Sequence, residues 1–153
     1  MHLTRRLSAR PAVVRGAAVT SGGILLGFAG LQAALAAGAP FGEHVWGGGQ
    51  QRVLPTGMRV ASGGAAVALT GAATIVARRA GLVGRPARWL APATWGIAGY
   101  LALNTAGNLA SSSSVERLIF GPATAIASTL TAVVAVGAAS STAVGASPVT
   151  IRR

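Results

Sequence analysis

The chain has 153 residues, of which 52% are hydrophobic and only 10% are charged. Soluble domains usually carry about 25% charged residues, so this composition excludes an ordinary soluble domain. The formal net charge of +11 comes from arginines at the ends of apolar segments, with no single basic face, which argues against nucleic acid as a partner.

The most informative pattern is a series of long stretches without any charged side chain. They cover residues 16–42, 60–77, 89–115 and 118–151. A helix needs roughly 20 apolar residues to cross the hydrocarbon core of a bilayer. The sequence therefore predicts an all-α fold, a four-transmembrane-helix bundle in the bacterial cytoplasmic membrane, with the lipid bilayer as its first partner.

In chain order, we expect a basic cytoplasmic tail, a transmembrane domain over 16–139 and a Ser/Thr-rich cytoplasmic tail. The predicted limits are 1–15 for the first tail, about 16–39, 60–77, 89–108 and 118–139 for the spans, and 140–153 for the second tail. Proline disfavours helix in the preceding residue, so Pro40 is the expected end of the first span. An alternative is that residues 1–39 form a cleaved secretory signal, although the uncharged run exceeds the usual h-region of about 7 to 15 residues.

The arginines predict how the spans are oriented. Short cytoplasmic loops retain an excess of Lys and Arg. Ten arginines fall in the two tails and the loop 78–88, whereas three fall in the other two loops. Both termini are therefore predicted to be cytoplasmic.

Polar side chains gather toward the predicted outer side. Gln32 lies in the outer half of the first span, and Asn104 and Asn108 share one face of the third because they are four residues apart. Polar groups inside a membrane tend to face the bundle interior or a cavity. We therefore predict an outward-facing pocket lined by these amides, with Glu43 and Glu116 at its mouth. The remaining residues of the candidate site lie beside the carboxylates: His44, Trp46 and Arg117.

Structural roles are open alternatives for the same residues. The amides can serve only as hydrogen bonds between helices. Glu116 can complete an S-x-x-E capping box with Ser113. Arg117 can pair locally, Glu43 and His44 can be solvated, and Trp46 can be an interfacial anchor.

Catalytic signatures are missing from the sequence. It contains no GxxxxGK[ST], HExxH or GxSxG pattern, no cysteine and no metal-ligand spacing. We therefore predict no catalytic, metal-binding or cofactor-binding residue and expect no cofactor.

Two segments resemble a family of small four-span bacterial membrane proteins. The first runs Gly38-Ala-Pro-Phe-Gly42, Trp46-Gly-Gly48 and Arg52-Val-Leu-Pro55, and the second runs from Asn108 through Ser113 to Glu116-Arg117 and Pro122. Phe120 stands where the family often has Trp. The resemblance covers residues 30–122 and implies the architecture, because the family has no assigned activity.

Three functional hypotheses remain open at this point. The first is a non-enzymatic accessory bundle that binds a membrane protein partner or a second copy of itself, as the Gly23/Gly27 pair would allow. The second is a small solute or proton carrier using the outer pocket, with Thr70, Thr74 and Tyr100 continuing the path inward. The third is a membrane enzyme in which Glu43, His44 and Glu116 converge at the outer surface.

The arginine bias makes a direct prediction about topology. Reporter fusions at the N-terminus, at Arg85 and at Arg153 should all report the cytoplasm, and a fusion at Gln50 should report the outside. An external signal from the Arg85 fusion would contradict the predicted orientation.

Overall fold

The computed structural model describes residues 11–85 and 87–144, and this part of the chain is entirely helical, without a strand. Four long helices, α1 to α4, make up most of it, and two short turns, η2 and η3, complete it. Their bounds are α1 Pro11–Ala37, the 3₁₀ turn η2 Gly42–His44, α2 Thr56–Arg79, α3 Leu90–Ala110, the π-helical turn η3 Glu116–Phe120 and α4 Gly121–Val144. The predicted all-α fold class is confirmed.

The helices extend further than the predicted spans. α1 is already helical at Pro11, the first described residue, which lies inside the predicted first tail. α4 runs to Val144 where we predicted a loose tail from residue 140. The rest of the two predicted tails, 1–10 and 145–153, lies outside the described residues.

Gly38, and not Pro40, ends the first helix. Its φ of 98° is left-handed, the Gly38 N–H donates to Leu35 O at 3.0 Å and the Ala39 N–H donates to Ala34 O at 2.9 Å. This pair of bonds is the Schellman arrangement, which satisfies the last carbonyls of a helix. The Arg59 side chain from α2 adds a hydrogen bond from Nε to Ala36 O at 3.0 Å.

Three helical segments are long and apolar enough to cross a membrane: α1, α2 and Glu116–Gly137, which joins η3 to α4. α3 has 21 residues, but Pro92, Asn104 and Asn108 lower its hydropathy. Large apolar side chains such as Val67, Leu103 and Leu118 are about three-quarters exposed, as expected where lipid replaces water as the solvent.

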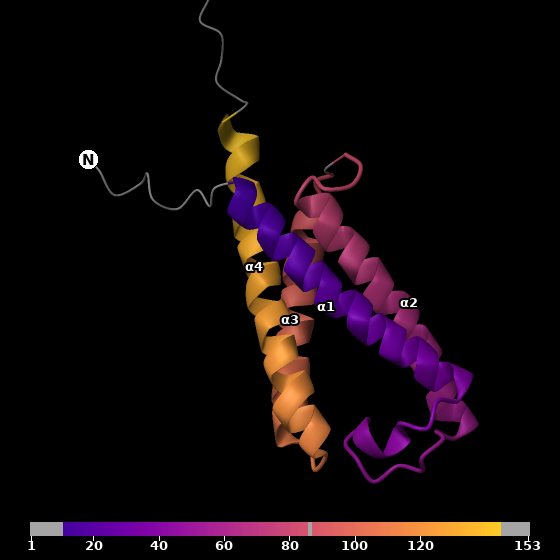
Figure 1. Ribbon diagram of the computed structural model, residues 1–153. Helices are drawn as coiled ribbons and strands as arrows, with labels where there is room; N and C mark the ends of the chain where they lie inside the picture. The colour runs from indigo at the N-terminus through magenta and orange to yellow at the C-terminus, as the bar shows by residue number, and fades with distance from the viewer. Residues whose placement is uncertain (1–10, 86, 145–153) are drawn as a thin grey trace, which may run out of the picture.

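The helices form two antiparallel hairpins, α1–α2 and α3–α4. Figure 1 shows that the hairpins lie together at the end near the 80–89 turn and diverge toward the other end, where the long loop, residues 38–55, is found. α1 also packs on α4, which joins the hairpins. The two ends of the bundle are named here the short-turn end and the long-loop end.

Hydroxyl groups bridge the helices in the half near the short-turn end. Ser21 Oγ and Thr131 Oγ1 are 2.6 Å apart between α1 and α4, and Ser128 Oγ donates to Ala98 O at 2.9 Å between α4 and α3. An apolar cluster that includes Leu25, Val76 and Val134 surrounds them. Gly23 and Gly27, the pair predicted to allow contact with a partner, are exposed, and a Cβ added at either would meet nothing within 4 Å.

The helix end at Gly38 can be tested by a matched pair of substitutions. Gly38→Ala places a side chain at a left-handed φ, which costs roughly 1 to 2 kcal/mol, and should lower the unfolding temperature in detergent. Gly16→Ala changes an exposed α1 position with open space around it, and should leave the unfolding temperature unchanged or raise it. Equal stability of the two variants would contradict the role of Gly38.

Candidate functional site

The long loop has a fixed shape of its own. The Gly42 N–H donates to Arg52 O at 2.9 Å, and a side chain at Gly42 would collide with the carbonyl of Gln51. Val45 and Leu54 are buried against Leu35 of α1. The loop therefore folds back on itself and is anchored to the end of the first hairpin.

The tip of the loop has an unusual backbone. Trp46 has a φ of 55°, and the next three residues, Gly47 to Gly49, have φ values of 86°, 80° and 73°. A left-handed conformation is uncommon for a residue with a side chain, and such strain persists only when surrounding contacts fix it. Here the indole Nε1 of Trp46 donates to Ser62 Oγ on α2 at 3.3 Å.

Glu116 receives the tip of the loop. The Gly47 N–H lies 3.0 Å from Glu116 Oε2 and 3.3 Å from Oε1, and the Ser111 hydroxyl donates to the same carboxylate. Glu116 is only 7% exposed. This carboxylate therefore connects the loop of the first hairpin to the turn of the second.

The predicted capping box forms only in part. The Glu116 N–H donates to Ser113 Oγ at 3.4 Å, as in a capping box, but the Ser113 N–H donates to Ser111 Oγ at 3.0 Å and not to the Glu116 carboxylate. The carboxylate is directed toward Gly47 instead, because the long loop brings a backbone donor to it. Glu116 also begins the π-helical turn η3, a local widening of the helix that is frequent at functional sites.

Two serines reinforce the docking of the loop. Ser112 Oγ donates to Gly47 O at 2.5 Å, and Ser113 Oγ donates to His44 O at 3.0 Å. A Cβ at Gly48 would lie 3.1 Å from Ser112 Oγ and 3.2 Å from Ser113 N, so a glycine is needed for this close approach. The loop is thus docked on the turn between α3 and η3 at the long-loop end of the bundle.

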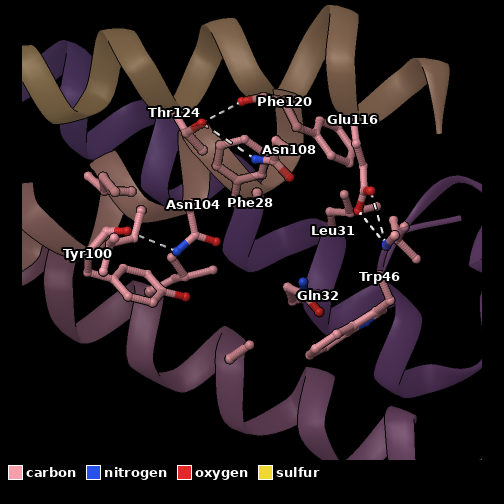
Figure 2. A pocket seen from close by; sticks show the side chains of 17 residues that line it. Phe28, Leu31, Gln32, Trp46, Tyr100, Asn104, Asn108, Glu116, Phe120 and Thr124 are labelled. Atoms are coloured by element: carbon pink, nitrogen blue, oxygen red, sulfur yellow. Dashed lines mark hydrogen bonds between the residues drawn. The ribbon is translucent and has the colours of Figure 1, made fainter. Parts of the chain in front are cut away.

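A pocket of about 560 Å³ lies between the diverging hairpins and the loop tip. Figure 2 shows Gln32 of α1, Asn104 and Asn108 of α3, Trp46 of the loop and Glu116 of η3 around it. Phe28 and Phe120 form part of the wall in an edge-to-face pair with ring centroids 5.4 Å apart. The volume falls within the range of about 300 to 1,000 Å³ typical of small-ligand sites.

The hydrogen bonds of the two asparagines fix how their amides are oriented. Asn104 Nδ2 donates to the carbonyl of Tyr100 at 3.0 Å, and a carbonyl can only accept. Thr124 Oγ1 donates to Phe120 O at 2.8 Å and so accepts from Asn108 Nδ2 at 3.5 Å. In both residues the amide nitrogen is engaged, which leaves the carbonyl oxygen to the pocket.

Gln32 supplies a third oxygen. Its Oε1 is buried and has no hydrogen-bond partner. An unpartnered buried acceptor is uncommon and costs roughly 1 to 3 kcal/mol. Among the described residues that line the pocket none is a cation, whereas Glu116 contributes a carboxylate.

The predicted site residues separate into two groups. Gln32, Trp46, Asn104, Asn108 and Glu116 line the pocket. The other three, Glu43, His44 and Arg117, are exposed and outside the lining. Arg117 Nη1 donates to Ser111 O at 3.0 Å, the local pairing that was one of its alternatives. Within residues 11–85 and 87–144 no three His, Cys, Asp or Glu side chains come together as metal ligands.

Sequence reasoning missed several residues of the site. Ser62 and Thr124 are small hydroxyl residues inside apolar helices, where hydropathy gives no sign of their roles. Ser111 was also missed, because the local partner expected for Glu116 was Ser113 in a capping box. Comparison with protein-family models, with curated proteins and with solved structures found no match for this chain.

Substitution of Glu116 tests its role in docking the loop. Glu116→Ala leaves the Gly47 N–H and the Ser111 hydroxyl without their acceptor, at a cost of roughly 1 to 3 kcal/mol. Glu116→Gln keeps one carbonyl oxygen but loses the charge, and charged acceptors bond roughly twice as strongly as neutral ones, so its cost should be intermediate. Hydrogen exchange of the Gly47 amide in detergent should accelerate in the same order.

Glu43→Gln is the control, because Glu43 is exposed and its side chain lies outside the pocket. It should leave both stability and exchange unchanged. If Glu116→Ala exchanges at Gly47 as slowly as the parent protein, the carboxylate does not hold the loop.

Proposed function

We propose that this protein is a non-enzymatic, multi-pass membrane protein that binds a small hydrogen-bond donor in the pocket at its long-loop end. In this proposal α3 completes a four-span bundle, although it is not among the three segments that are apolar enough by composition to cross a membrane. The termini lie in the cytoplasm of a bacterium and the pocket opens outward, as the arginine distribution favours. Membership of the resembling four-span family agrees with this architecture and stays a prediction.

The observation that carries the proposal is the convergence of acceptor oxygens beside a carboxylate. Gln32 Oε1 has no partner among the described residues, and one N–H of each of the Asn104 and Asn108 amides is already engaged elsewhere. The Glu116 carboxylate adds negative charge to the same wall. A primary ammonium group, with three donors and a positive charge, is the simplest complement to such a wall. A phosphate or carboxylate ligand would find mainly acceptors there and be repelled.

Binding fits the geometry better than catalysis. The enzyme hypothesis requires Glu43, His44 and Glu116 to converge, but only Glu116 lies in the pocket wall. General acid–base catalysis needs a titratable group within hydrogen-bond reach of the reacting atom. Glu116 is the only carboxylate among the described lining residues, and the docked loop already occupies it.

The carrier hypothesis requires a polar path beyond the pocket. Thr70 and Thr74 are exposed on α2, and their hydroxyls donate to carbonyls of their own helix, Ala66 O and Thr70 O, at 2.9 Å. The half of the bundle toward the short-turn end contains the apolar cluster around Leu25 and Val76. These features favour a binding site over a continuous polar path. The accessory role with a protein partner or a second copy stays a prediction.

The proposal can be tested with a cysteine introduced into the pocket at a position that leaves the acceptor side chains in place. Gly107 lines the pocket, and a side chain added there meets nothing within 4 Å. In this naturally cysteine-free chain, Gly107→Cys should react with a small polar thiol reagent added from the outside, and ethylammonium should protect it. Acetate at the same concentration should not protect it.

Ala106→Cys is the matched control, because Ala106 is exposed on α3 outside the pocket and faces lipid in the proposed arrangement. Its labelling should be slow and insensitive to ethylammonium. Labelling of Gly107→Cys that ethylammonium leaves unchanged would overturn the proposed ligand chemistry. Absence of labelling in a folded, inserted protein would overturn an open pocket.

A further inference from the structure

A second, apolar pocket lies beside the polar one, between α2 and α3. It has a volume of about 330 Å³. Small side chains create it, with Ala65, Ala68 and Ala72 on α2 facing Ala93 and Gly96 on α3. α2 packs mainly on α1, and α3 mainly on α4, so these two helices leave space between them. This apolar pocket is named here the trough.

The trough and the polar pocket are adjacent. Ala65, Leu69 and Tyr100 line both of them. Along α3 the combined lining runs from Ala93 to Asn108, about 22 Å at 1.5 Å per residue. The polar groups lie at the end of this path near the long loop, and apolar groups line the rest. A molecule with a polar head and an apolar chain, that is, an amphiphile, matches this distribution.

The trough also lies on the side from which a membrane molecule would arrive. Ala68 and Gly96 are exposed and belong to the trough alone. Val67 and Leu103, beside it on the two helices, are each 75% exposed and face lipid in the proposed arrangement. A molecule dissolved in the bilayer can therefore reach the polar pocket laterally, between α2 and α3, without passing through the docked loop.

We infer that the natural ligand is a single-chain amphiphile with a primary ammonium head, which enters from the bilayer with its head among Gln32, Asn104 and Asn108 and its chain in the trough. This inference rests on the proposed function and adds the apolar chain and the route. Lipid tails are as apolar as the trough, so the chain gains little by leaving the bilayer. Its role is to concentrate the head group at the depth of the pocket, because each CH₂ raises membrane partitioning about fourfold.

Fluorescence of Trp46, which lines the polar pocket, gives a direct readout in phosphatidylcholine nanodiscs. Trp89→Phe and Trp95→Phe in the same chain remove the other two tryptophans, which lie outside both pockets. Dodecylamine should give a saturable change at a much lower concentration than ethylamine. Dodecanoate should give none, and a saturable response to dodecanoate would overturn the ammonium head.

Two variants fill the trough from opposite helices, Ala68→Phe on α2 and Gly96→Leu on α3. Overpacking of this kind should weaken dodecylamine binding about tenfold or more and leave ethylamine binding unchanged. Gly99→Leu adds the same bulk on an exposed part of α3 outside both pockets and should change neither.

The outcomes separate the two proposals. If ethylamine binds but both trough variants bind dodecylamine as tightly as the parent, the chain does not lie in the trough and this inference fails while the proposed function stands. If neither amine gives a saturable change in the parent protein, the proposed function itself fails.

Discussion

The contact between the Glu116 carboxylate and the Gly47 N–H is the interaction on which the open end of this bundle depends. The two hairpins diverge there, and the polar contact adds to the packing of Phe120 against Phe28 and the Leu35 cluster of the first hairpin. The carboxylate fixes the distance by binding a backbone donor from the first hairpin and the Ser111 hydroxyl from its own hairpin. A charged acceptor suits this task, because hydrogen bonds to ionised groups are the stronger ones.

The strained tip of the loop follows from that contact. The Gly47 N–H reaches Glu116 only because the backbone turns left-handed from Trp46 onward, and Trp46 accepts this angle while its indole is held by Ser62. The loop is therefore attached to α2 and to η3 at once. The wall of the pocket is built from these same attachments, so the shape of the binding site and the closure of the bundle have one physical origin.

The sequence was sufficient to predict the helices and the grouping of the amides. Hydropathy and the absence of charges mark apolar helices, and the four-residue spacing of Asn104 and Asn108 places them on one face. The sequence was not sufficient to predict the partner of Glu116. It allowed either a capping box with Ser113 or a place at the mouth of the pocket, and the donor found in the structure, the Gly47 N–H, lies 69 residues away. The prediction that Pro40 ends the first helix was wrong, because the left-handed conformation of Gly38 ends α1 before the chain reaches the proline.

The division between hydroxyls and amides along the bundle has a physical reason. Three hydroxyl residues are fully buried: Ser21, Thr94 and Thr131. Each lies within hydrogen-bond distance of a neighbouring hydroxyl or a backbone carbonyl, so its hydrogen bonding is satisfied within the protein. Amides have both a donor and an acceptor side, and the described residues engage the donor side of Asn104, through Tyr100 of α3, and of Asn108, through Thr124 of α4. With Gln32 Oε1 also unpartnered, the oxygens that remain define a site that is incomplete in hydrogen bonding. A buried acceptor without a donor costs free energy. A ligand that donates hydrogen bonds to these oxygens removes that cost, which favours its binding.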